Sequence, residues 1–327
     1  MKIITNILNN IQCKRNNPAG LEATTLAKMF DLKFVGKPNR NNKDCEDYID
    51  YRELNWKEVT EVYMYLSPVN FFGGVVQPQA PEIAMLVIKM WENGAKIRIL
   101  AYDPKIKITN YVTAIRSKLP NSISAEKEVV FSNLLRDAEY LFPGKDIVKF
   151  WDSIYTQEFT HLDWFKEVFR DYPISDFLPI EDKESAFLYY GDNRGSYRQK
   201  QVRKFIPDNR SSLIISMKNH GLDNVNFKKK VKHSELKHHI DHSTTSLVIG
   251  DPEHEDNVIT FRVYETLASS ALAAIPRQFD PNMEIIQDEE LKKVCYIDTK
   301  EDLVRLANSY SKDLINRQHE EFRRLIS

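Results

Sequence analysis

The sequence lacks several features that would assign it to a class of protein at once. Its 327 residues contain only three cysteines, Cys13, Cys45 and Cys295, which are far apart and show no metal-binding spacing. We therefore expect free thiols and a reducing compartment. No apolar run approaches the roughly 18 residues of a membrane span, and the opening MKIITNILNN is too short and too polar for a signal peptide.

An excess of charge of either sign is also absent. The chain has 46 lysines and arginines against 47 aspartates and glutamates, for a formal net charge of −1. This balance does not by itself indicate a nucleic-acid-binding protein, so such a role requires cations gathered on one face. No Gly-Lys-Ser/Thr sequence of a Walker loop occurs, and the glycines lack the spacing of the nicotinamide-binding fingerprint.

Length and patterning favour a two-domain α/β protein. A chain of 327 residues is long enough for about two ordinary domains, and 42% hydrophobic residues can fill two cores. Strand and helix patterns alternate in the first half, which favours a mostly parallel sheet with helices on both faces. The expected strands are Lys2–Leu8, Leu32–Val35, Val59–Leu66, Lys96–Ala101 and Val129–Phe131, and the expected helices are Ala23–Phe30 and Ile83–Glu92.

The same alternation returns after an acidic, proline-containing segment, Asp171–Asp182, which we interpret as a linker. The expected strands are Ala186–Tyr190, Leu213–Ser216, Ser246–Ile249 and Leu272–Ile275, and the expected helices are 196–205 and Lys300–Ile326, the last possibly divided in two. We predict two doubly wound domains, residues 1–175 and 183–308, that face a central cleft. Ligands of such sheets bind beyond the carboxyl ends of the strands.

The most informative stretch is LVIGDPEHEDNVITFRVYETLASSALAAIPRQF, at Leu247–Phe279. It reads as a strand, a polar loop, a helix and a strand, with Arg262 and Glu265 on one helical face. A guanidinium can bind phosphate in a forked geometry, and a carboxylate can accept two hydrogen bonds from a ribose diol. The pair therefore suits a nucleoside diphosphate. The alternative is a surface ion pair, which is common at this spacing.

Further candidates stand at strand ends and helix starts. Asp103 follows the expected strand Lys96–Ala101, which places a carboxylate at the carboxyl edge of the first sheet, and Glu22 begins the first helix. Most such residues serve only a turn or the helix dipole. In the loop YGDNRGSYRQK, Arg194 and Arg198 bracket the start of a helix whose amides favour anions.

These blocks together resemble the DNA β-glucosyltransferase family of T-even-type bacteriophages. The dense matches are the opening MKI, Glu22 at a helix start, VNFFGG at Val69–Gly74, the strand-end Asp103, the YG..R...R loop and the block IGD....DN.IT.RV.ET.AS. They are scattered over most of the chain. The resemblance implies transfer of glucose from UDP-glucose to 5-hydroxymethylcytosine in phage DNA.

The resemblance also implies a fold and a set of roles. The fold is the GT-B arrangement of two Rossmann-like domains, in which a C-terminal helix, about residues 309–327 here, completes the first domain. By position, Asp103 is the catalytic base. The implied donor ligands are Arg194, Arg198 and Arg262 for the diphosphate, Glu265 for the ribose, and Glu22 and Asp251 near the sugar. A divalent metal, Mg²⁺ or Mn²⁺, is expected to assist. The segment PKIKITN after Asp103 departs from the family pattern, which leaves the sugar and the acceptor base open.

An acceptor inside a double helix requires base extrusion and phosphate contacts. Asn70, Phe71 and Phe72 can fill the gap or line a base pocket, although ordinary packing of the rings is the alternative. The candidate cations are Lys105, Lys107, Lys228, Lys229, Lys230, Lys232 and Lys237, although a charge run is usually a solvated face. His238 and His242 lie at i,i+4 near His233 and His239, but with no cysteine or HExxH partner we favour a surface helix over a zinc site.

Two other functions stay open. One is the same reaction with a pentose donor such as UDP-arabinose. The other is a nucleotide-sugar-binding or DNA-binding relative without catalysis. The argument against it is that the full set of implied site residues is retained: Asp103, Arg194, Arg198, Arg262 and Glu265. We expect a monomer that acts on double-stranded DNA containing modified cytosine, in the cytoplasm of an infected bacterial host and without a membrane.

Overall fold

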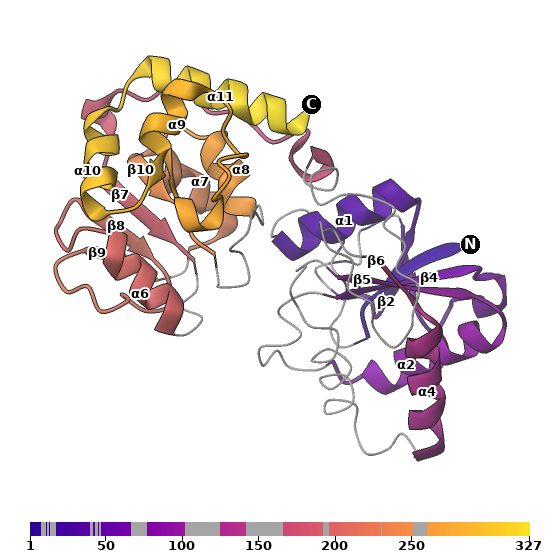
Figure 1. Ribbon diagram of the computed structural model, residues 1–327. Coiled ribbons are helices and arrows are strands. Elements are labelled where there is room, and N and C mark those ends of the chain that lie inside the picture. Colours follow the sequence, from indigo (N-terminus) through magenta and orange to yellow (C-terminus); the bar gives the residue numbers. More distant parts are fainter. Residues whose placement is uncertain are drawn as a thin grey trace. The chain divides into compact units, whose positions relative to one another are not determined.

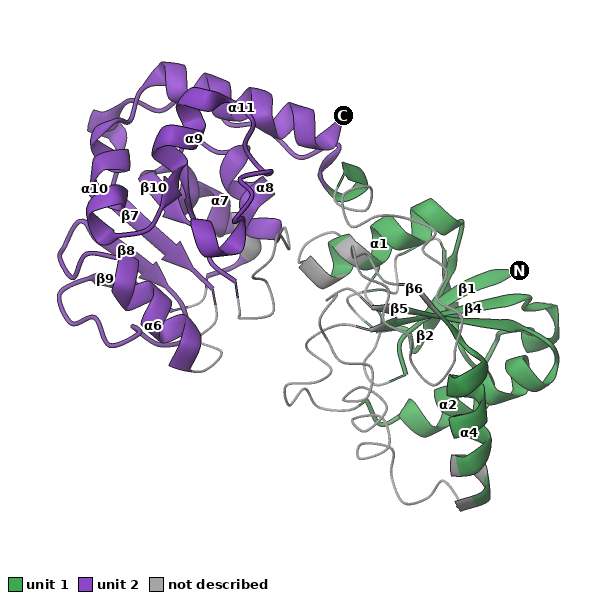
Figure 2. Ribbon diagram, viewed as in Figure 1, with its two compact units in different colours: residues 1–168 green, residues 169–327 purple. Residues whose placement is uncertain are grey.

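A computed structural model divides the chain into two compact units, residues 1–168 and 169–327 (Figures 1 and 2). The structure describes residues 1–7, 11, 13, 18–39, 42, 45, 47–66, 77–101, 125–141, 166–191, 196–229, 231–250 and 260–327. Within these ranges, no helix has the length and apolar character needed to cross a membrane. Each unit contains one six-stranded, entirely parallel sheet, as the alternating pattern predicted.

The first unit has the strand order β3-β2-β1-β4-β5-β6. Its strands are β1 (Lys2–Thr5), β2 (Lys33–Gly36), β3 (Tyr48–Asp50), β4 (Glu61–Leu66), β5 (Lys96–Ala101) and β6 (Glu139–Leu141). Its helices are α1 (Pro18–Phe30), α2 (Ala80–Glu92) and α4 (Ala125–Asp137). From β1 the chain builds outward through β2 and β3 and then returns to β4 on the other side of β1. Between β1 and β4 lies the switch point at which such sheets bind ligands.

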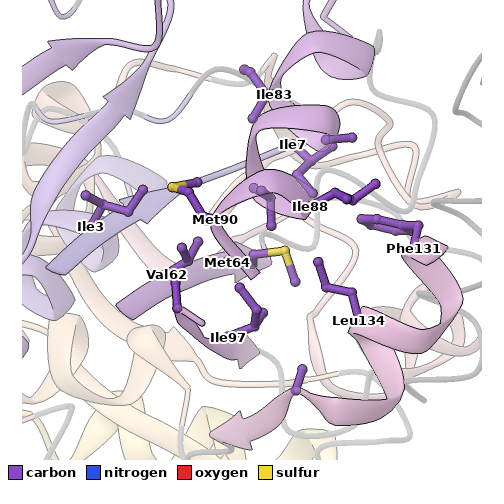
Figure 3. Close-up of a cluster of buried hydrophobic side chains, with 14 of the residues drawn as sticks. Ile3, Ile7, Val62, Met64, Ile83, Ile88, Met90, Ile97, Phe131 and Leu134 are labelled. Carbon is purple, nitrogen blue, oxygen red and sulfur yellow. The ribbon is translucent and has the colours of Figure 1, made fainter. Parts of the chain in front are cut away.

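The core of the first unit forms where α2 and α4 cover the sheet (Figure 3). Strand residues such as Val62, Met64 and Ile97 pack there with Ile88 of α2 and Leu134 of α4, all at most 3% exposed. The buried positions of α2 recur three and four residues apart, which gives the helix one apolar face. Burial of this face stabilises the helix far more than local propensity does.

The second unit repeats this topology with the order β12-β11-β10-β7-β8-β9. Its strands are β7 (Ser185–Tyr190), β8 (Ser212–Ile215), β9 (Asn226–Lys228), β10 (Ser243–Leu247), β11 (Leu272–Pro276) and β12 (Tyr296–Ile297). Its helices are α6 (Ser196–Phe205), α7 (His233–Asp241), α8 (Phe261–Leu267), α9 (Glu289–Cys295), α10 (Lys300–Asn308) and α11 (Lys312–Ile326). Here the switch point lies between β7 and β10, which pair directly.

The C-terminal helix α11 packs onto the second unit. Its buried Gln318 accepts a hydrogen bond from the Ala273 N–H at 2.8 Å and donates to the carbonyls of Thr266 at 3.1 Å and Ala271 at 2.9 Å. The side chain therefore ties α11 to the end of α8 and to β11. The sequence resemblance assigned residues 309–327 to the first domain, and a return of this helix to the first unit stays a prediction.

One expected strand is wrong. Residues Val129–Phe131 lie within α4, where Val129 is 61% exposed and Phe131 is buried. The short apolar run is part of a helical pattern, because Phe131, Leu134 and Leu135 fall three and four residues apart on one buried face. The sixth strand of this sheet is β6, directly after the helix.

The cysteines also differ from expectation. Cys13 and Cys45 form a disulfide across 32 residues of sequence, so they are not the free thiols that their separation indicated. Cys295 is a buried free thiol, as expected. Because disulfides are rare in reducing compartments, the expectation of such a compartment loses the support that it took from the cysteines.

Replacement of Gln318 by alanine should destabilise the second unit. The change removes the side-chain partner of the buried Ala273 N–H and the shorter of two hydrogen bonds to the Ala271 carbonyl, and each unsatisfied buried group costs about 1–3 kcal/mol. The free energy of unfolding, measured in urea, should fall accordingly. Glu320→Ala changes a side chain of the same helix that is 72% exposed, so it should be nearly neutral. Equal effects of the two substitutions would contradict this assignment.

Candidate functional site

The switch point of the second sheet carries the described residues that the sequence singled out for the nucleoside diphosphate, Arg198, Arg262 and Glu265. Helix α6 follows β7 and carries Arg198, and α8, the first described helix after β10, carries Arg262 and Glu265. Both helices therefore begin on the carboxyl side of the two central strands. This is the edge at which a doubly wound sheet binds its ligand.

Arg262 is held by the ends of the two central strands. Its Nε donates to the carbonyl of Tyr190, the last residue of β7, at 3.0 Å. Its Nη1 donates to the carbonyl of Ile249, just after β10, at 2.9 Å. The guanidinium also lies 5.8 Å from the centre of the Tyr190 ring. These contacts fix a cation at the switch point, so Arg262 is not half of a surface pair with Glu265.

Gly191 leaves room for this guanidinium. It follows β7 with a φ of +145°, and a Cβ built on it would lie 2.5 Å from Nη2 of Arg262 and 3.0 Å from the Tyr189 hydroxyl. Any larger residue would displace the arginine and strain the backbone. Gly191 therefore makes room for the Arg262 guanidinium, in addition to the backbone freedom that the sequence predicted for it.

Glu265 is buried at 5% exposure and accepts a hydrogen bond from the Tyr190 hydroxyl at 2.8 Å. Burial, and then the charge of Glu265, raise the pKa of Tyr190 well above its ordinary value, so the hydroxyl keeps its proton and donates. Tyr190 thus orients the Glu265 carboxylate through its hydroxyl and Arg262 through its backbone carbonyl. Sequence reasoning did not assign this role to Tyr190. A tyrosine at the last position of a buried strand was the available signal, because its hydroxyl needs a partner.

Arg198, in the first turn of α6, is 3% exposed. A cation buried this deeply is unusual on a structural helix and fits a site for an anion. Nearby His220, 1% exposed, has its Nε2 3.0 Å from the hydroxyl of Ser216, the residue after β8. Burial, and then the charge of Arg198, lower the pKa of His220 to about 4. Sequence reasoning missed both His220 and Ser216.

Many of the predicted site residues lie outside the described residues. They are Asp103, Arg194, Asp251, Asn70, Phe71, Phe72, Lys105, Lys107 and Lys230. Glu22 lies in α1, but its side chain is not among those described. In the first unit, two described strands end just before predicted site residues. Strand β5 ends at Ala101, two positions before Asp103, and β4 ends at Leu66, four positions before Asn70.

The lysines proposed for DNA divide into two groups. Lys228, Lys229 and Lys232 are exposed on β9 and in the turn before α7. Lys237 instead pairs with Asp241 at 3.1 Å and donates to the Ser175 hydroxyl within the second unit. Its amine is engaged in holding α7, so it is the weakest of the predicted phosphate contacts that the structure describes.

Among the residues that the structure describes at this edge, the implied divalent metal finds no cluster of three protein ligands. Among the described residues, one group of three potential ligands occurs, Glu184, His238 and His239, and it lies before β7 and at the end of α7. The switch point supplies the cations Arg198 and Arg262 instead. An ion here would have to be held chiefly by the phosphates of a ligand, together with any carboxylate outside the described ranges.

The buried His220 should make the folded protein less stable as the pH decreases. The unfolded chain protonates this group near its ordinary pKa of 6.5, whereas the folded protein does so only near 4. The unfolded state therefore binds more protons as the pH falls from about 6.5 to 4, which costs up to about 3 kcal/mol of folding free energy.

A His220→Asn variant tests this contribution, because asparagine tolerates the residue's φ of +60°. Between pH 7.5 and 4.5 the unfolding free energy of the wild type should fall by about 2 kcal/mol more than that of the variant. The lowered pKa values of His239 and His319 affect both proteins alike. Parallel declines would show that His220 does not carry the effect.

Comparison with known proteins supports the resemblance that the motifs indicated. No family model matches the chain. A curated relative, the DNA β-glucosyltransferase of Enterobacteria phage T4, is 22% identical over 291 residues, which cover 83% of this chain and 80% of the relative.

Solved structures agree with this match. A mutant of the T4 β-glucosyltransferase in complex with UDP-glucose superposes with a TM-score of 0.72 at 19% identity, over 99% of this chain and 95% of that one. The same enzyme with UDP and Mn²⁺ gives 0.69 at 19% identity, over 100% and 95%. An α-glucosyltransferase with UDP and a 13-mer DNA gives 0.55 at 11% identity, over 100% and 95%.

The two parallel-sheet units are thus those of the GT-B glycosyltransferase structures. In sequence and in fold, this chain is similar to the DNA β-glucosyltransferase of phage T4, as its motifs indicated.

Proposed function

We propose that this protein is an inverting DNA glycosyltransferase that moves a sugar from a UDP-sugar to the hydroxyl of a modified cytosine in phage DNA. The observation that carries the proposal is Arg262, fixed between the ends of β7 and β10, beside the buried pair of Tyr190 and Glu265. This is a cation and a carboxylate at the switch point of a chain similar in sequence to a DNA β-glucosyltransferase.

The donor binds to the second unit. Arg262 and the buried Arg198 neutralise the diphosphate, with Arg194 as the third cation implied by the family resemblance. Glu265, oriented by Tyr190, accepts hydrogen bonds from the ribose hydroxyls. Asp251 and Glu22 are the acidic residues that we place near the sugar, again by resemblance.

The chemistry follows from the charge that must leave. UDP departs as an anion, and preorganised arginines stabilise the negative charge that develops on it in the transition state. The acceptor hydroxyl attacks the anomeric carbon from the opposite face, and its proton passes to the carboxylate of Asp103. A single base without a nucleophile gives inversion, through a transition state with oxocarbenium character. A divalent ion, Mg²⁺ or Mn²⁺, would add positive charge at the diphosphate when bound.

The acceptor is double-stranded DNA with 5-hydroxymethylcytosine or a related base. The target base must leave the stack to reach a buried site, and Asn70, Phe71 and Phe72 are the residues that we expect to line its pocket or fill the gap. Lys105, Lys107, Lys228, Lys229, Lys230 and Lys232 are the proposed phosphate contacts, so that DNA affinity should fall with salt. We infer that the protein acts as a monomer in the cytoplasm of an infected bacterial host.

Glucose is the donor sugar that the resemblance favours, and UDP-arabinose is the alternative. Incubation of the protein with each UDP-sugar, Mg²⁺ or Mn²⁺ and hydroxymethylated or unmodified DNA, followed by mass spectrometry of the nucleosides, distinguishes them. A hexose or a pentose on hydroxymethylcytosine names the donor. No transfer from any UDP-sugar, with UDP binding intact, would point to a relative without catalysis.

Asp103→Asn should abolish most of the sugar transfer without weakening the binding of UDP. Loss of the base should lower kcat by about 10²–10⁴-fold, whereas UDP affinity should change little because Arg198, Arg262 and Glu265, the described residues proposed to bind UDP, all lie in the second unit. Asp137→Asn, an exposed aspartate at the end of α4, is the matched control and should retain full activity. Full-rate turnover by the Asp103 variant would eliminate this residue as the base.

Gly191→Ala should weaken UDP binding by displacing Arg262. Loss of charge-assisted hydrogen bonds to a phosphate, about 1.5–3 kcal/mol, corresponds to at least a tenfold rise in Kd in calorimetric titration with UDP. Arg262→Lys should do likewise, because an ammonium cannot reproduce the fork.

The control for Gly191 is Gly94→Ala. Gly94 also has a positive φ, +90°, but nothing lies within 4 Å of its added Cβ. It should therefore lower stability without altering the Kd for UDP. If the Gly191 variant binds UDP as tightly as the Gly94 variant, the assignment of Arg262 to the diphosphate site is wrong.

A further inference from the structure

Three potential metal ligands meet at the other edge of the second sheet. Glu184 directly precedes β7, and His238 and His239 lie in the last turn of α7, which leads into β10. Each side chain contributes one ligand atom, and these atoms lie within 4.8 Å of one another. They stand at the amino ends of β7 and β10, whereas the proposed donor site lies at the carboxyl ends of the same strands.

The backbone under these residues is fixed by hydrogen bonds of its own. The Glu184 N–H donates to the His242 carbonyl at 2.8 Å, and the Ser243 hydroxyl donates to the His239 carbonyl at 2.8 Å. Nδ1 of His242 lies 2.8 Å from the His238 carbonyl oxygen. The fold thus positions the backbone that carries the three ligands.

One ring nitrogen of His239 lacks a hydrogen-bond partner among the described residues. His239 is only 9% exposed, and the nitrogen in question is its buried Nδ1. Buried polar atoms are normally satisfied, and an imidazole nitrogen is a common ligand of metal ions.

The other two ligands are open to solvent. The side chains of Glu184 and His238 are 53% and 54% exposed, and His238 Nε2 lies 3.6 Å from a carboxylate oxygen of Glu184. A metal ion can therefore enter from water and replace this loose contact. With no ion, the same geometry is a loose surface contact between an imidazole nitrogen and a carboxylate.

We propose that Glu184, His238 and His239 form a site for Zn²⁺ or a similar divalent transition metal. Two imidazoles and one carboxylate suit zinc, and three protein ligands leave the fourth tetrahedral position to water. Occupancy ties the end of α7 to the start of β7 and so stabilises the second unit. The site is independent of the proposed transferase reaction.

The test uses the full-length protein without a histidine tag, freed of metal with EDTA and studied without UDP. Zn²⁺ is titrated by calorimetry, and Co²⁺ is added as a spectroscopic probe of tetrahedral coordination. The variants are Glu184→Gln and His239→Gln. Glu235→Gln is the matched control. Glu235 is 54% exposed, close to the 53% of Glu184, and it lies on α7, the helix that carries His238 and His239.

Wild type and Glu235→Gln should bind one Zn²⁺, melt at a higher temperature with it, and give the intense visible bands of tetrahedral Co²⁺. Glu184→Gln and His239→Gln should bind Zn²⁺ at least about tenfold more weakly and lose those bands, because losing a ligand costs at least as much as losing an outer partner. Melting in EDTA checks that each variant is folded. The proposal is overturned if the wild type does not bind Zn²⁺, or if Glu184→Gln and His239→Gln bind it as tightly as the control.

Discussion

The second unit depends on one arrangement of charge, the guanidinium of Arg262 between the carbonyl ends of β7 and β10. Parallel strands leave carbonyl groups at their carboxyl ends that have no partner in the sheet, and two of them fix this cation. Gly191 supplies the space, and Tyr190 connects the same network to Glu265. A fixed guanidinium and a fixed carboxylate at one edge of the sheet complement the phosphates and the ribose hydroxyls of a nucleoside diphosphate.

The shared topology explains why the candidate residues fall where they do. Both sheets have the order 3-2-1-4-5-6, so each has one switch point beside its first strand. In the second unit the helices that follow β7 and β10 supply Arg198, Arg262 and Glu265. In the first unit Glu22 lies in the helix after β1, and Asp103 comes two positions after the end of β5. The carboxylate proposed as base thus comes from the first half of the chain, and the arginines proposed for the leaving group come from the second.

Sequence patterns predicted the fold class, most strands and the position of Arg262 and Glu265 on one helix, because these depend on local spacing. They failed where distant residues decide the outcome. Strand β10 was placed at Ser246–Ile249, whereas it spans Ser243–Leu247. Its serines and threonines are buried but satisfied, for example by the contact of Ser243 with Ser185 across the sheet. The disulfide of Cys13 with Cys45 and the partners of His220 and Tyr190 were likewise invisible, since each joins segments far apart in the chain or depends on burial.

The most direct measurement of the central claim is calorimetric binding of UDP and 2′-deoxy-UDP to the wild type and to Glu265→Gln. If Arg262 holds the diphosphate while Glu265 binds the ribose, the wild type should prefer UDP by about tenfold or more, as expected for loss of a charged hydrogen bond. The variant should lose most of that preference. Equal affinity of the wild type for the two nucleotides, or no binding of either, would contradict the account.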